Sequence, residues 1–191
     1  MDQIAERYRR RADAFEQKVA GVRPEQWENQ SPCEKWSARD VVEHVVVMHG
    51  VMLRPAGRVL ETSVQDDPLA AFRAARTAVE AVLDDPELAA QDCETPAGRM
   101  TAADQIDRVV SDDLVLHGWD LARATGQDET MDPVDVERLW ASNSAIPPEV
   151  IEQYRTPGAF GPGIEVFGPE VSVPESAPLQ DRLLGYIGRQ P

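Results

Sequence analysis

The chain has 191 residues and a formal net charge of −15, with 34 acidic and 19 basic residues. This length suits one domain, or one domain with an appendage, that buries a real hydrophobic core. The basic residues are scattered, so we expect no nucleic-acid partner and no membrane partner, because both would require a concentrated basic surface. No apolar run approaches the ~20 residues of a transmembrane helix and the charged N-terminus is unlike a signal peptide, so we expect a cytoplasmic protein.

The first half of the chain predicts three amphipathic helices. Apolar residues recur at steps of three and four along each of them, which is the spacing of one helix face. Ser37 and Asp40 have the form of a capping box at the start of the second helix. The loop before it contains Trp27 and Trp36, which we expect to plug one end of a helical core. The predicted helices cover residues 2–20, 37–53 and about 67–84.

The second half predicts one long helix followed by shorter elements. Residues 85–100 contain two prolines and indicate a turn or small hairpin. Thr101 and Asp104 repeat the capping-box pattern and open an uninterrupted helix that ends at Gly126. Residues 145–178 hold most of the remaining proline and glycine and are expected to be irregular or extended. Short helices are predicted over about 133–144 and 178–187.

The two cysteines, Cys33 and Cys93, show no C-x-x-C spacing. They therefore indicate neither a disulfide framework nor a thiolate metal site, and we expect reduced thiols. Cys33 lies near the start of the second helix, where a helix dipole could lower the pKa of its thiol. An inert buried thiol is the preferred interpretation.

Three side chains form a candidate metal site. Asp113 and His117 are four residues apart on an apolar helix face, and His44 lies in the apolar stripe of the second helix. Two imidazoles and one carboxylate from facing helices are a common way to build a metal centre, and three protein ligands leave positions open for water or substrate. Zinc is the first choice of divalent ion, and nickel, manganese or iron(II) suit the same donors.

Other interpretations of these residues stay open. Asp113 and His117 could pair only with each other, while His44 is a core histidine whose hydrogen bonds are satisfied. Asp120 could accept a hydrogen bond from a ring nitrogen of His117, but a solvated or capping role is preferred. His49 lies about 140° around the helix from His44, so both cannot face one site.

Three segments, SPCEKWSARDVVEHVV, DDLVLHGWDLARATG and FGPEVSVPESAPLQDRLLGYIGR, occur in this order. In combination they resemble an actinobacterial metal-binding family of the DinB-like superfamily, related to the N-terminal domain of mycothiol-dependent maleylpyruvate isomerase. The resemblance implies an all-α fold, with a four-helix bundle over residues 1–130 and a C-terminal extension over 131–191 that packs on it as one domain. It also implies that His44, Asp113 and His117 hold the metal, with an aspartate where the isomerase has a glutamate.

The resemblance implies a thiol-dependent transferase or isomerase in which a divalent metal, zinc or else nickel, activates a thiol or water. Mycothiol is the expected co-substrate, with bacillithiol as another low-molecular-weight thiol that relatives use. The expected partners are thus a small-molecule substrate or thiol, and relatives commonly form homodimers. Two alternatives remain: a helical bundle that binds a metal or ligand without turnover, and a metal-free structural protein.

Overall fold

The computed structural model describes residues 2–60, 62, 64, 67–95, 98–159 and 166–191. It contains two compact units, Met1–Glu129 and Thr130–Pro191, and each is described by itself. Helices dominate both units, and the described residues contain a single two-stranded sheet. The predicted all-α fold class is therefore confirmed.

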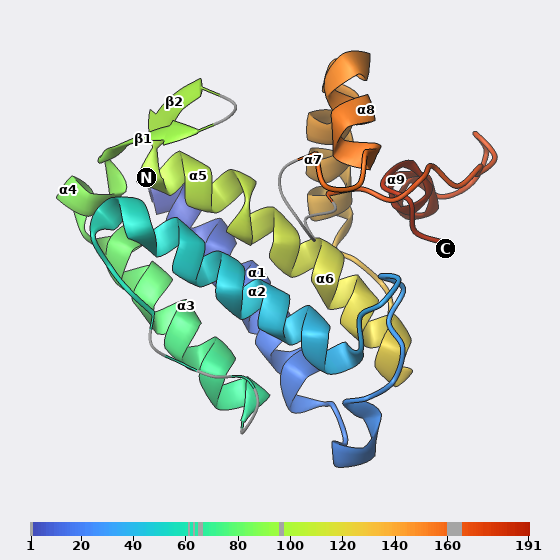
Figure 1. Ribbon diagram of the computed structural model, residues 1–191, viewed down its shortest axis with the longest axis horizontal. Coiled ribbons are helices and arrows are strands. Elements are labelled where there is room, and N and C mark those ends of the chain that lie inside the picture. The colour runs from blue at the N-terminus through green and yellow to red at the C-terminus, as the bar shows by residue number, and fades with distance from the viewer. Residues whose placement is uncertain (1, 61, 63, 65–66, 96–97, 160–165) are drawn as a thin grey trace. The chain divides into compact units, whose positions relative to one another are not determined.

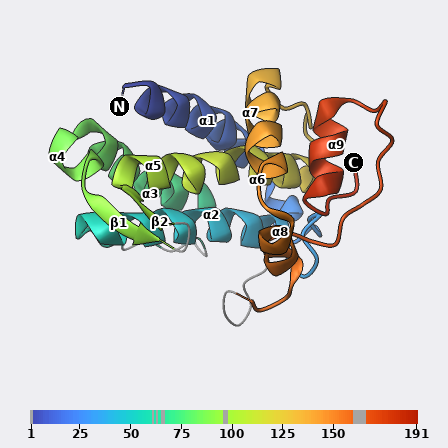
Figure 2. The same cartoon turned by 90° about the horizontal axis from the view of Figure 1, so that it is seen from above.

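The first unit is a four-helix bundle (Figure 1). Helix α1 packs against α3 and α6, and α2 packs against the same two helices, so the four form a closed ring. Figure 2 shows α1 and α2 on opposite sides of this ring. The four bundle helices are α1 (Asp2–Ala20), α2 (Ala38–Leu53), α3 (Pro68–Asp84) and α6 (Val110–Thr125), and α5 (Ala102–Arg108) directly precedes α6.

Local sequence signals explain where these helices begin. The Ser37 side chain accepts a hydrogen bond from the backbone N–H of Asp40, whose own side chain returns to the Ser37 backbone, which completes the predicted capping box. The Asp67 side chain caps α3 by accepting from Ala70 N, and Pro68 occupies the first turn, where no N–H partner is required. The predicted extents of α1, α2 and α3 are confirmed.

Large apolar side chains fill the centre of the bundle. Phe15 of α1 and Phe72 of α3 are fully buried and lie with ring centroids 4.9 Å apart in a tilted arrangement, which is favourable for aromatic pairs. Valines of α2 and leucines of α6 complete this core. Close packing thus holds the facing helices at a fixed spacing. Side chains on α2 and α6 that face each other are therefore also held at fixed positions.

The prediction of one uninterrupted helix ending at Gly126 is wrong at Val109. This residue has φ −105° and ψ −73°, and it separates α5 from α6. Val109 and Val110 are both β-branched, and such residues are less well accommodated in helices. Arg11 of α1 also reaches this point, where its Nη1 donates to Ser111 Oγ at 3.0 Å and to Asp112 Oδ1 at 2.7 Å.

The segment before α5 contains the predicted hairpin and an additional short helix. Strands β1 (Asp92–Thr95) and β2 (Gly98–Thr101) pair in antiparallel register, with Cys93 opposite Met100. The short helix α4 (Pro86–Ala89) is capped by Asp85, whose Oδ1 accepts from Glu87 N at 2.9 Å. Connecting segments add the 3-10 turns η1 (Pro24–Gln26) and η2 (Arg54–Ala56).

The second unit contains α7 (Pro133–Ser144), α8 (Pro148–Arg155) and α9 (Leu179–Tyr186). The predictions of α7 and α9 are confirmed, but the expectation that residues 145–178 hold no helix is wrong over α8. The expectation rested on the proline and glycine content of this segment, whereas Pro148 occupies the first helical turn, a position that favours proline. The sequence IEVFGPEVSVP within this segment shows a weak strand-like alternation, and its first residues, 164–165, lie outside the described residues. That this unit packs on the bundle stays a prediction.

Close backbone contacts in the second unit require glycine. Gly188 has φ +89°, and a Cβ atom at this position would lie 2.5 Å from the backbone of Gly168. A larger residue at 188 would therefore separate the segment that follows α9 from the chain around Gly168.

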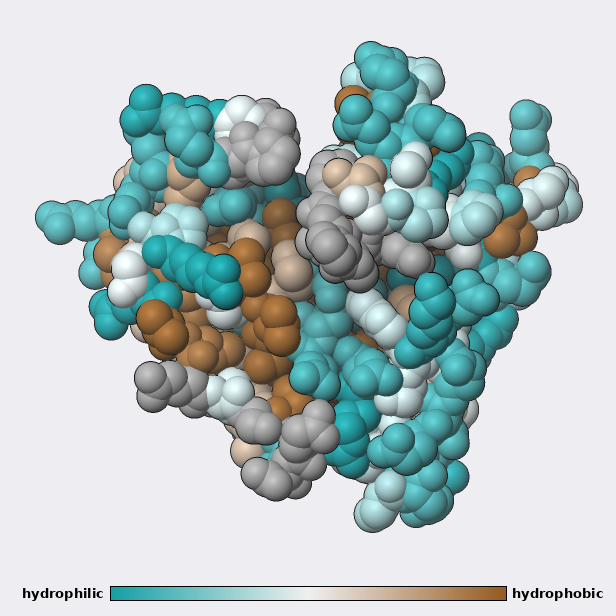
Figure 3. Space-filling model, in the orientation of Figure 1, coloured by the Kyte–Doolittle hydropathy of each residue, from teal (hydrophilic) through white to brown (hydrophobic). Residues whose placement is uncertain are grey.

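The surface of the first unit is mixed in character. Figure 3 shows a patch of apolar side chains on the face that is turned to the viewer. One exposed apolar side chain of this unit is Val47 of α2, which is 54% exposed. Among the helices that the structure describes, none is both long enough and apolar enough to cross a membrane.

Candidate metal centre

The bundle brings the three predicted metal ligands together. His44 comes from α2, and Asp113 and His117 lie one turn apart on α6, which packs directly against α2. One donor atom from each of the three residues lies within 4.8 Å of the other two. His44 Nε2 and Asp113 Oδ2 are 3.5 Å apart, and the two imidazole rings have centroids 4.8 Å apart. The shorter aspartate thus reaches the two histidines.

This cluster is open on one side and buried on the other. The side chains of His44 and Asp113 are 28% and 24% exposed, whereas that of His117 is 9% exposed. Trp36 covers part of the cluster, with its ring centroid 4.8 Å from that of His44 and 5.8 Å from that of His117. Two imidazoles and one carboxylate in this arrangement fit a divalent ion and leave room on the exposed side for a further ligand.

Asp120 forms a hydrogen bond with the buried ring nitrogen of His117. Its side chain is fully buried, and Oδ2 lies 2.9 Å from Nδ1 of His117. The preferred interpretation of Asp120 as solvated or capping is therefore wrong, because residues three apart on a helix are neighbours and this pair faces inward. An ionised carboxylate can only accept, so Nδ1–H donates and Nε2 keeps the lone pair that a metal needs.

Replacing Asp120 with asparagine is expected to weaken metal binding by about 10–100-fold, the usual cost of losing the carboxylate behind a metal-ligating histidine. The matched control is Asp112→Asn, which makes the same chemical change on α6 but at a carboxylate bound by Arg11. Isothermal titration of both variants with zinc measures the difference. Equal zinc affinities for Asp120→Asn and wild type would contradict the role of Asp120.

Cys33 and Trp36 join the site from the loop before α2. The Cys33 thiol donates to Asp120 Oδ2 at 3.3 Å. Cys33 is only half-buried, so the prediction of a buried thiol is wrong. Trp36 was expected only to plug the core, yet its ring stacks beside the two histidines. Helical periodicity says nothing about where a loop places its side chains. The one available signal was the proximity of Cys33 and Trp36 to the His44 helix.

His49 lies apart from the metal cluster, as its angular separation from His44 predicts. It is fully buried in the bundle, with Nδ1 2.7 Å from Val45 O and Nε2 3.0 Å from the Tyr8 hydroxyl. Burial lowers the pKa of His49 to about 4, against smaller opposing effects of the Val45 hydrogen bond and of Asp113. The most deeply buried histidine of α2 is thus His49, whereas His44 sits at the edge of the core.

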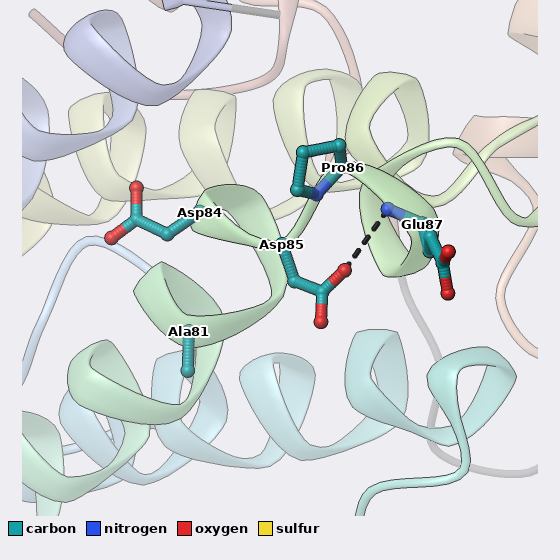
Figure 4. Close-up of a pocket in the computed structure, with 5 residues that line it drawn as sticks. All are labelled: Ala81, Asp84, Asp85, Pro86 and Glu87. Carbon is teal, nitrogen blue, oxygen red and sulfur yellow. Dashed lines mark hydrogen bonds between the residues drawn. The ribbon is translucent and has the colours of Figure 1, made fainter.

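A pocket described on the first unit lies elsewhere. It is lined by Ala81, Asp84, Asp85, Pro86 and Glu87, where α3 meets α4. Figure 4 shows the Asp85 carboxylate turned toward the backbone N–H of Glu87, which is a helix cap. Asp84 pairs with Arg9. These carboxylates therefore have structural partners, and the pocket contains none of the candidate ligands.

Comparison with known proteins supports both the fold and the relationship. The family model described as "Mycothiol maleylpyruvate isomerase N-terminal domain" matches residues 8–62. The crystal structure of a histidine-to-alanine mutant of mycothiol-dependent maleylpyruvate isomerase has a TM-score of 0.54 and 14% identity, over 82% of this chain and 73% of that chain. At this identity the match shows a common fold.

A full-length relative extends the match beyond the first helices. An uncharacterized protein of Mycobacterium tuberculosis, present in strains H37Rv and CDC 1551, is 32% identical over 184 residues, which is 95% of each chain. The chain therefore belongs to the same actinobacterial family as this mycobacterial protein, a family related to the N-terminal domain of mycothiol-dependent maleylpyruvate isomerase.

Proposed function

We propose that this protein binds one divalent metal ion, zinc or else nickel, through His44, Asp113 and His117, and that it is a thiol-dependent transferase or isomerase. The observation that carries the proposal is the convergence of one carboxylate and two imidazoles from α2 and α6 to within 4.8 Å of one another. The relationship to mycothiol-dependent maleylpyruvate isomerase supports mycothiol as the co-substrate.

The protein's own residues would divide the work between them. His44, Asp113 and His117 would hold the ion, which when bound favours the thiolate of an added thiol or the hydroxide of water. Asp120 keeps the His117 proton on Nδ1 and so presents Nε2. Trp36 shields the two imidazole rings, while the exposed edges of His44 and Asp113 leave an approach for a small thiol.

The test is thiol consumption by the purified full-length protein. Zinc-loaded protein is mixed with mycothiol and an electrophile that has an activated double bond, and free thiol is followed with time. We expect turnover for wild type and a loss of turnover for His44→Ala and His117→Ala, with His49→Gln as a control histidine outside the cluster. Zinc binding without any thiol consumption across a panel of such electrophiles would contradict the enzymatic role.

The alternative is a bundle that binds a metal or small ligand without turnover. It requires only the three converging donor atoms and no step of turnover. This alternative predicts stoichiometric zinc in wild type, loss of zinc in His44→Ala, and no change in the rate of thiol consumption when zinc-loaded protein is added.

A further inference from the structure

Cys33, which has no role in the proposed function, belongs to a second set of donor atoms together with His117 and Asp120. Its Sγ lies 3.3 Å from Asp120 Oδ2, and the same oxygen lies 2.9 Å from His117 Nδ1. One donor atom from each of these three residues lies within 4.8 Å of the other two. The two donor sets therefore share His117 and differ in both remaining members.

The spacing of the second set suits a tetrahedral metal. Zinc lies about 2.3 Å from thiolate sulfur and about 2.0–2.2 Å from nitrogen or oxygen, which puts neighbouring donors about 3.3–3.6 Å apart. The sulfur–oxygen separation is already within that range. The nitrogen–oxygen separation needs to open by only a few tenths of an ångström. The donor atoms of Cys33 and His117 lie within 4.8 Å of each other, so these two side chains would also move closer together to hold one ion.

Charge favours a divalent ion at this position. A Cys33 thiolate and the Asp120 carboxylate carry two negative charges, and a neutral His117 adds none, so a divalent ion would be neutralised completely. Asp120 is fully buried and His117 is buried, and a neutral group of charges is much less costly to bury than a charged one. The set of His44, Asp113 and His117 would instead leave one positive charge, which suits its more exposed position.

The loop holds the thiol in place. Backbone hydrogen bonds run from Ser31 N to Trp36 O at 2.9 Å and from Trp36 N to Cys33 O at 3.1 Å. The Cys33 N–H also donates to Ser31 Oγ at 3.2 Å. The sulfur is therefore positioned by a closed turn, and ordering it on metal binding costs little further entropy.

We propose that Cys33, His117 and Asp120 form a second metal position, selective for soft, thiophilic ions such as cadmium, and alternative to the position at His44 and Asp113. Thiolate ligands select soft and thiophilic ions, zinc among them, whereas two imidazoles and a carboxylate also suit nickel and manganese, so the softest ions should prefer the position that contains the thiolate. The structure thus assigns two positions to one centre, on the two nitrogens of a single imidazole.

The shared imidazole makes the two positions mutually exclusive. Binding at Nδ1 requires the lone pair of that nitrogen, so the His117 proton moves from Nδ1 to Nε2 and the Cys33 thiol releases its proton to solvent. With Nε2 protonated, His117 no longer offers a lone pair toward His44 and Asp113. The chain should therefore bind one ion in total, at a position that depends on the softness of the metal.

The experiment is a cadmium titration of the full-length, reduced, metal-free protein, followed by the ultraviolet charge-transfer absorption of cadmium–thiolate bonds. We expect wild type to develop this absorption and to saturate at one cadmium per chain. His44→Ala should keep it, because His44 belongs only to the other set, and Cys93→Ser should keep it as the matched cysteine control. Cys33→Ser should lose it, and His117→Ala should require higher cadmium concentrations.

A second measurement needs no variant. At ten times its dissociation constant, cadmium leaves about one Cys33 thiol in eleven unbound, so it should slow alkylation of Cys33 by iodoacetamide about tenfold while leaving Cys93 unaffected. Absorption that survives in Cys33→Ser, cadmium binding without thiolate absorption, or two cadmium ions per chain would each overturn the proposal. Failure of the proposed function is distinguishable, because it appears as zinc binding that is insensitive to His44→Ala.

Discussion

Replacing His117 with alanine is expected to abolish stoichiometric zinc binding and the stabilisation that zinc confers. An ion that binds only the native state at 100 times its dissociation constant raises the free energy of unfolding by about 2.7 kcal/mol. For a chain of this length, that corresponds to a rise in Tm of about 5–10 °C. Thermal unfolding of wild type with zinc and with a chelator should show this difference, and His117→Ala should show none.

The comparison with the other two histidines makes this prediction specific. His44→Ala loses one ligand of the proposed zinc position, so its zinc-dependent rise in Tm should be smaller than that of wild type, but it keeps the second donor set and should still respond to cadmium. His49→Gln should retain the full zinc-dependent rise in Tm, because His49 is hydrogen-bonded to Tyr8 and Val45 within the core. A wild type whose Tm is the same with zinc and with chelator would leave the metal-free structural alternative as the better account.

The fold was largely predictable because its helix boundaries are encoded locally. Ser37 and Asp40 form the expected capping box, and Pro68 occupies the first turn of α3, a position that favours proline. The break at Val109 was not predictable from the apolar pattern, which continues in phase on both sides. It coincides with contacts from Arg11, about a hundred residues earlier in the chain, which only the tertiary structure reveals.

The candidate site was predictable as far as helix geometry determines it. The i,i+4 spacing put Asp113 and His117 on one face, and the bundle topology brought His44 across to them. Asp120 could have been assigned from its i,i+3 spacing to His117, but its burial depends on the loop that covers it. Cys33 and Trp36 are supplied by that loop, whose path depends on hydrogen bonds such as Ser31 N to Trp36 O and not on any periodicity.

His49 should make the stability of the protein depend on pH between about 6.5 and about 4. Burial lowers the pKa of His49 to about 4 in the folded state, and the unfolded chain has the ordinary value of about 6.5. Between these values the unfolded state binds a proton that the folded state does not, so the free energy of unfolding falls as the pH falls. The difference of about 2.5 units between the two pKa values amounts to about 3 kcal/mol of stability. This stability is fully present above pH 6.5 and is lost by about pH 4.

Burial explains why the neutral form of His49 is preferred, and its two hydrogen bonds determine which ring nitrogen carries the proton. The Nδ1–H donates to Val45 O and Nε2 accepts from the Tyr8 hydroxyl, so a proton on Nε2 would require this hydroxyl to turn its own proton away and accept instead. His49→Gln can still accept from Tyr8 but does not titrate. The difference in free energy of unfolding between wild type and this variant, measured by urea unfolding in the presence of chelator, should therefore shrink by about 3 kcal/mol from pH 7 to pH 4. Because carboxylates that titrate in both proteins cancel in this difference, a constant value would show that His49 is protonated equally in the folded and unfolded states.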